Sequence, residues 1–105
     1  MNVNSNYVLK NFDDSLIEVD QKGGFLFLKK VLIDSLCYED TEIKPTPEQK
    51  MRAYDLCMKL TSEEVVELLS EDIVFIKVRL LKLYNALIYG QVVKLLEDST
   101  NSTLI

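Results

Sequence analysis

The stretch from Ser70 to Tyr84 is the feature that most constrains the fold of this 105-residue chain. Its apolar residues form one stripe at helical spacing and a second stripe beside it. The first stripe consists of Ile73, Ile76, Leu80, Leu83 and Tyr84, and the second of Val74, Val78 and Leu81. A helix with so broad an apolar surface must be central in its domain, or it must also contact a partner.

A second helix is predicted upstream by its start signals. Thr46 can act as the N-cap, Pro47 suits the first helical position, and Gln49 completes a capping box. We expect this helix to run to about Leu60. Its predicted inward face carries Tyr54, Cys57 and Met58.

The boundaries of the last two helices are predicted in the same way. Ser70 is expected to cap the helix that ends near Tyr84, with Leu69 packing onto Val74 as a hydrophobic staple. Asn85 is expected to cap a final helix over residues 86–97. Gly90 lies inside that helix, where glycine costs about 1 kcal/mol, so we expect another backbone to pass close to it.

The N-terminal part predicts a different structure. Residues 7–20 read as a β-hairpin that turns at Asp13–Ser15, and residues 21–24 as a flexible break. Within residues 25–38 the apolar residues recur at helical spacing, which predicts a helix, although the first four residues could instead continue the sheet. Residues 65–69 are ambiguous. A capping-box spacing over 61–64 favours a helix, and the alternative is a brief strand that pairs with the hairpin.

These elements predict a mainly α fold of the α+β type, with an N-terminal β-hairpin packed on a compact bundle of three to five helices. Residues 1–97 should form a single globular domain, and residues 98–105 a flexible C-terminal tail. The predicted core consists of Leu28, Leu32, Leu36, Tyr54, Met58, Ile73, Ile76, Leu80, Leu83, Val92 and Leu96.

The composition excludes several classes of chemistry. The chain has no histidine, which rules out Ser-His-Asp and Cys-His arrangements and removes the commonest metal ligand. No phosphate-loop or dinucleotide-binding spacing occurs around Gly23 and Gly24. We therefore expect no catalytic residues, no cofactor, no metal site and no small-molecule ligand. A small enzyme or a nucleotide binder is the disfavoured alternative.

The two cysteines, Cys37 and Cys57, are expected to be reduced thiols that pack as small buried hydrophobes. A disulfide between them, and a zinc site shared by two copies, are the less favoured alternatives. The net charge of −5 argues against direct nucleic-acid binding, because that binding usually needs a basic surface. With no signal peptide pattern and no membrane-length apolar run, the expected location is the cytoplasm.

Two sets of residues are candidates for protein binding. The acidic set comprises Glu63, Glu64, Glu67, Glu71 and Asp72, whose simpler interpretation is helix-end electrostatics. Phe75 and Tyr89 lie off the main stripes and are candidates for exposed aromatic anchors. The acids in the predicted loops, Asp13, Asp14, Glu39, Asp40 and Glu42, are expected to be solvated rather than to form a site.

Residues 70–77 read SEDIVFIK and residues 82–92 read KLYNALIYGQV. In this spacing they resemble the C-terminal half of a group of small, uncharacterised phage and prophage proteins. Residues 49–60 are similar to a helix of the same proteins, and the hairpin matches in kind. Ala86 stands where that group has proline, which predicts a softer break between the last two helices. The resemblance implies a viral origin and a compact helical fold, and it implies no activity.

The expected function is that of a phage-type accessory protein that acts by stoichiometric protein–protein binding, in virion assembly or as a minor structural component. The alternative is an inhibitor of a host enzyme or defence system that uses its acidic surface. The partner would be a phage or host protein, or a second copy in a homo-oligomer. The location would be the bacterial host cytoplasm or the virion.

Overall fold

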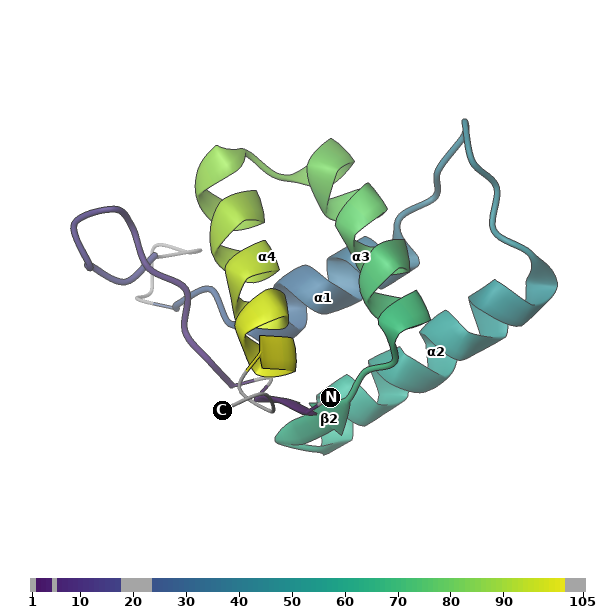
Figure 1. The fold of residues 1–105 in the computed structure, drawn as a ribbon, viewed down its shortest axis with the longest axis horizontal. Helices are drawn as coiled ribbons and strands as arrows, with labels where there is room; N and C mark the ends of the chain where they lie inside the picture. The colour runs from purple at the N-terminus through teal and green to yellow at the C-terminus, as the bar shows by residue number, and fades with distance from the viewer. Residues whose placement is uncertain (1, 5, 18–23, 102–105) are drawn as a thin grey trace.

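The computed structural model describes residues 2–4, 6–17 and 24–101, with no account of the side chains of residue 2 and residues 98–101. It confirms the mainly α, α+β architecture. The elements follow in the order β1 (Asn2–Asn4), α1 (Leu28–Cys37), α2 (Pro47–Ser62), β2 (Val65–Glu67), α3 (Ser70–Leu83) and α4 (Ala86–Asn101). Figure 1 shows α3 and α4 side by side, with α1 passing behind them and α2 along the lower edge.

The predicted start of α2 is confirmed. The Thr46 hydroxyl accepts a hydrogen bond from the Gln49 N–H (3.1 Å), and the Gln49 side chain accepts one from the Thr46 N–H (2.9 Å). Asn85 caps α4 as expected, because its side-chain oxygen accepts the Ile88 N–H at 3.1 Å. Both caps satisfy N–H groups that a helix start leaves without partners.

The predicted cap of α3 is wrong by one position. The N-cap is Leu69, and Ser70 is the first helical residue. The Asp72 carboxylate reaches back and accepts the Leu69 N–H at 2.8 Å. The two residues of the expected staple, Leu69 and Val74, are both exposed. An acid in the first helical turn therefore replaces the serine that the sequence suggested.

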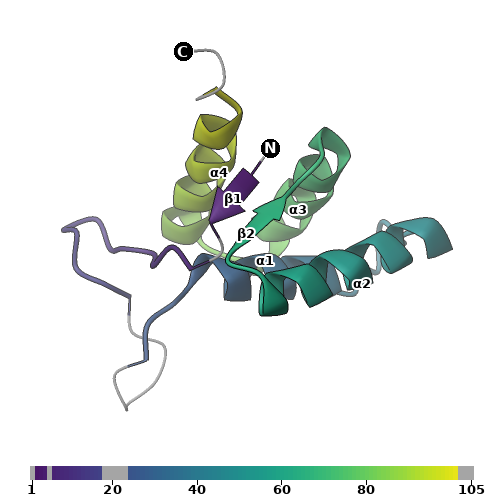
Figure 2. The same ribbon diagram turned by 90° about the horizontal axis from the view of Figure 1, so that it is seen from below.

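Residues 65–69 do not form the helix that the capping spacing favoured. Residues 65–67 form β2, which pairs antiparallel with β1 in the register Val3 to Val66. The hydroxyls of Thr61 and Ser62 donate to the Met58 carbonyl instead of capping a new helix. The strand alternative was thus correct, but its partner lies N-terminal to the hairpin. Figure 2 shows the two strands side by side at one end of α2.

The predicted hairpin is present as an irregular antiparallel segment. Lys10 pairs with Leu16 around a turn, and Asp14 adopts a left-handed φ of 68° at that turn. The hairpin was predicted to run to residue 20, but residues 18–23, with most of the predicted flexible break, lie outside the described part. Phe25–Phe27 remain extended, and the Leu28 N–H donates to the Tyr7 carbonyl at 2.8 Å, so α1 begins only at Leu28.

The core lies where α1 packs against α2 and α3, with β2 and α4 closing it. Most predicted core residues are buried: Leu28, Leu32, Leu36, Ile73, Ile76, Leu80, Val92 and Leu96. Three predictions are wrong, because Tyr54, Met58 and Leu83 are exposed. On α2 the buried residues are instead Ala53, Leu56 and Leu60.

Two expectations about α4 also change. A Cβ atom built on Gly90 would meet nothing within 4 Å, so no close backbone explains this glycine. The helix continues to Asn101, beyond the predicted end at residue 97. The last part of the predicted tail, residues 102–105, lies outside the described residues.

Candidate functional site

An open groove of about 620 Å³ lies between the end of α1, the loop after it and α2. Phe75 of α3 contributes to its wall, together with Leu36 and Ala53. The same three residues border a second hollow of about 470 Å³, which reaches the start of α3. Phe75 therefore separates two adjoining depressions on one side of the molecule.

Phe75 is held in place by Arg79, one turn later on α3. The guanidinium carbon lies 3.4 Å from the centre of the Phe75 ring, and Nη1 donates to the Phe75 carbonyl at 3.3 Å. Arg79 is only 3% exposed, and burial lowers the pKa of its guanidinium. Its Nε has no hydrogen-bond partner among the described residues. This stack on an aromatic face fixes the ring and so the shape of the groove.

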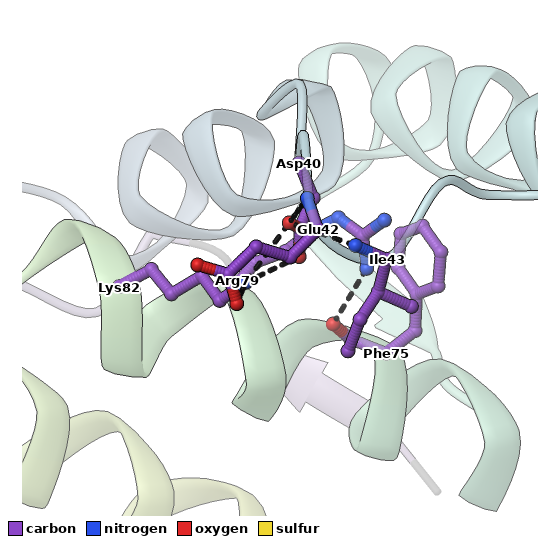
Figure 3. A network of polar contacts seen from close by, with 6 residues as sticks. All are labelled: Asp40, Glu42, Ile43, Phe75, Arg79 and Lys82. Carbon is purple, nitrogen blue, oxygen red and sulfur yellow. Dashed lines mark hydrogen bonds and ion pairs between the residues drawn. The ribbon is translucent and has the colours of Figure 1, made fainter.

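The loop after α1 is fixed by Asp40, which was expected to be solvated but is 5% exposed. Lys82 donates to both of its carboxylate oxygens at 2.9 Å, and the N–H groups of Glu42 and Ile43 donate to one of them (Figure 3). The hydrogen bond from Lys82 is the main cause that lowers the pKa of Asp40 to about 2. The solvated-loop interpretation of Asp40 is therefore wrong.

A second buried carboxylate lies at the other end of α3. Asp72 accepts two hydrogen bonds from the Arg52 guanidinium, at 3.1 and 2.8 Å, besides the Leu69 N–H. Burial opposes its ionisation, but these hydrogen bonds outweigh burial and leave the pKa of Asp72 lowered. Asp72 thus joins α2 to α3. It is not available to a partner, although the sequence suggested it as a protein-binding residue.

The remaining members of the predicted binding set are placed differently. Glu63, Glu64, Glu67 and Glu71 are all exposed. Phe75 and Tyr89 are half-buried and pack against the core. They are therefore not the freely exposed anchors that the sequence suggested.

The outer face of α2 is a feature that the sequence analysis misassigned. We define the α2 outer row as Met51, Tyr54 and Met58, which are 60%, 60% and 54% exposed. At about 100° per residue the row lies opposite Ala53, Leu56 and Leu60, which face the core. Both faces of α2 are apolar, so periodicity alone could not say which one is buried. The outer row is the candidate binding site.

The two cysteines meet where α1 ends beside α2. Their Sγ atoms are 3.5 Å apart, Cys37 is exposed, and Cys57 is half-buried. The expectation that both are buried is wrong for Cys37, because it lies at the last position of α1 and borders the open groove. Both residues are free thiols in this structure.

The chain matches no family model, no curated protein and no solved structure. Among the described residues, no group of three or more His, Cys, Asp or Glu side chains is placed to hold a metal ion. Within the same residues, no helix has the length and apolar character needed to cross a membrane.

Proposed function

We propose that this protein acts by binding another protein, and that the α2 outer row is the centre of the contact. The carrying observation is that three large apolar side chains, Met51, Tyr54 and Met58, are each more than half exposed on one helix face. Tyrosine is enriched at binding hot spots, and methionine adapts its shape to a partner surface. The solvent-facing side of a surface helix is normally polar, so an exposed apolar row of this kind indicates a contact with a partner.

The partner we propose has an apolar groove that accepts one helix and lies in a basic surface. A groove of this kind is the usual receptor for residues spaced like those of the outer row. Charges of both signs border the row on α2, including Glu48, Lys50, Asp55 and Lys59. The chain as a whole carries a net charge of −5, and this favours association with a positively charged protein.

The proposed class is a stoichiometric accessory protein rather than an enzyme. The buried acidic groups Asp40 and Asp72 are held by Lys82 and Arg52, so they stabilise the fold instead of presenting reactive groups. The resemblance to small phage proteins supports a role in virion assembly or as a minor structural component. It also supports the bacterial host cytoplasm as the place of action.

The test compares substitutions of exposed apolar side chains on two different helices. Met51→Glu combined with Met58→Glu changes the outer row, and Leu81→Glu changes a residue of α3 that is 67% exposed. A partner is purified with the wild-type chain from host cells, and its Kd is measured for each variant by calorimetry. Since each hot-spot side chain contributes more than 1 kcal/mol, the double variant should bind at least about 30-fold more weakly.

The control Leu81→Glu should bind as the wild type does. Equal affinities of the wild type and the double variant would refute the proposal. Light scattering of the free chain tests the alternative of a second copy as the partner, because a strict monomer at high concentration excludes self-association through this row.

A second candidate function is inhibition of a host enzyme or defence system through the acidic surface. The observation that favours it is the exposure of Glu63, Glu64, Glu67 and Glu71 around β2 and the start of α3. Such a complex would weaken steeply as salt is raised. A Kd that does not change between low and high salt would exclude this function, and it would also refute the basic surface proposed around the partner's groove, leaving only the apolar contact of the outer row.

A further inference from the structure

Two thiols that are twenty residues apart in the sequence meet at the wall of the groove. We propose that Cys37 and Cys57 are a modification site that closes a reversible intramolecular disulfide by exchange with a low-molecular-weight disulfide such as oxidised glutathione. This inference goes beyond the proposed protein binding and does not depend on it. It rests on the distance, the unequal exposure and the position of the two residues.

The distance is short enough for bond formation without refolding. The two Sγ atoms are 3.5 Å apart, and a disulfide bond is about 2.05 Å long. Closing the gap thus needs a movement of about 1.5 Å, which small rotations of the two side chains can supply. Cys37 is the last residue of α1 and Tyr38 is already extended, so the backbone can adjust at that end. Cys57 lies in the middle of α2 and is held by that helix.

The unequal surroundings of the two thiols set the order of events. Cys37 is exposed and borders the open groove, so a dissolved disulfide can reach its sulfur. Burial, followed by the hydrogen bond with Cys37, raises the pKa of Cys57 to about 12. Because the thiolate is the attacking species, Cys57 reacts poorly with a dissolved disulfide. Cys37 is therefore the entry point, and Cys57 is the resolving thiol.

The exchange proceeds in two balanced steps. The Cys37 thiolate attacks one sulfur of oxidised glutathione; the glutathione disulfide bond breaks, and one glutathione leaves as a thiolate. The Cys57 thiol gives its proton to solvent and attacks the Cys37 sulfur, and the second glutathione leaves. Two protein thiols are oxidised to one disulfide, and one oxidised glutathione is reduced to two molecules of glutathione. Excess reduced glutathione reverses both steps.

Charge around the pair does not select the oxidant. The groove that Cys37 and Cys57 border is lined by Lys44 and Lys50 as well as by Glu39 and Asp40. Because Asp40 is already paired with Lys82, two lysines and one glutamate remain, and the net charge beside the thiols is small. Proximity of the two sulfurs, rather than attraction of an anionic reagent, should drive the reaction.

The test measures the disulfide equilibrium of the wild-type chain in glutathione buffers, once in the native state and once in concentrated urea. Mass spectrometry after acid quenching counts the dithiol, the internal disulfide and the glutathione adduct. The equilibrium constant for the internal disulfide should be about 250-fold larger in the native state, as loop closure over twenty residues predicts. By linkage, this factor corresponds to about 3.3 kcal/mol of added stability in the oxidised protein.

Two variants test the order of the steps. Cys57→Ser should hold the glutathione adduct on Cys37, because no second thiol resolves it. Cys37→Ser should react much more slowly than the wild type, because the half-buried Cys57 is then the sole thiol. An equilibrium constant that is equal in the native state and in urea would overturn the proposal. A persistent glutathione adduct on wild-type Cys37, or disulfide-linked dimers as the main product, would overturn it as well.

Discussion

Replacing Asp72 by alanine should lower the free energy of unfolding by about 3 kcal/mol, because the change removes three hydrogen bonds at the junction of α2 and α3. The Asp72 carboxylate is 5% exposed and accepts from Arg52 twice and from the Leu69 N–H once. No other cap is present at the start of α3, where Leu69 offers no side-chain acceptor. The substitution therefore removes a helix cap and a contact between helices together.

The magnitude follows from these two parts. Loss of a capping carboxylate costs about 1 kcal/mol in typical helices. The paired hydrogen bonds from Arg52 are charge-assisted and partly buried, but the Arg52 side chain is 38% exposed and regains hydration once it is released. We therefore assign about 2 kcal/mol to this pair, below the 3–5 kcal/mol that breaking a fully buried ion pair costs.

Urea denaturation followed by circular dichroism measures the effect. A domain of this size should have an m-value of about 1–1.5 kcal/mol per molar urea, so the midpoint should fall by about 2–3 M. Glu71→Ala is the matched control, since Glu71 is the adjacent acid in the same helical turn but is exposed. It should change stability by less than about 0.5 kcal/mol.

If Asp72→Ala and Glu71→Ala shifted the urea midpoint equally, the hydrogen bonds of Asp72 would not be what stabilises this junction. A double-mutant cycle with Arg52→Ala separates the two parts of the effect. It should return a coupling of about 1–2 kcal/mol between Arg52 and Asp72. A coupling of zero would show that the carboxylate acts only as the cap of α3.

The remaining predictions concern acid stability, α4 and the N-terminal segment. The hydrogen bond from Lys82 lowers the pKa of Asp40 to about 2 in the folded chain, against 3.8 for an unperturbed carboxyl. Its contribution to stability is therefore present above pH 4 and is lost as the pH falls toward 2. Asp40→Asn should flatten the loss of stability over that range in acid titrations followed by fluorescence of the tyrosines, and an unchanged profile would contradict this assignment. Gly90→Ala should stabilise the protein by about 0.5–1 kcal/mol, because alanine has the higher helix propensity and its Cβ atom would meet no neighbour within 4 Å. A lower urea midpoint would show an unrecognised contact. Gln91→Ala should cost about 1 kcal/mol and speed hydrogen exchange at Lys10, because the Gln91 amide bonds both the N–H and the carbonyl of Lys10 at 2.8 Å; unchanged exchange at Lys10 would refute this link.

Several local features could be predicted from the sequence because they depend on neighbouring residues alone. The capping box of Thr46 and Gln49 and the cap at Asn85 involve groups three residues apart, so neighbouring residues alone suffice to form them. The buried stripe of Ile73, Ile76 and Leu80 was predicted as well, but the second stripe has a comparable spacing, and its members Val74 and Leu81 are exposed. These signals also sufficed for the overall α+β class.

The errors arise where two local patterns compete. On α2, the apolar row of Ala53, Leu56 and Leu60 competes with the row that contains Tyr54 and Met58. In the structure the first of these rows is buried in the core that α1, α2 and α3 share. Residues 65–67 likewise follow a capping signal that favours a helix. Their backbone N–H and C=O groups instead form the hydrogen bonds of an antiparallel pair with β1.

By itself the sequence determined where α2 and α4 start and that Ile73, Ile76 and Leu80 share one apolar stripe of α3. These properties depend on residues within one or two turns of each other. Only the tertiary structure decided that Asp40 is buried against Lys82, that the α2 outer row is exposed, and that the Cys37 and Cys57 sulfurs lie 3.5 Å apart. Each of these depends on how separate elements pack, and helical periodicity carries no information about which neighbour a given face will meet.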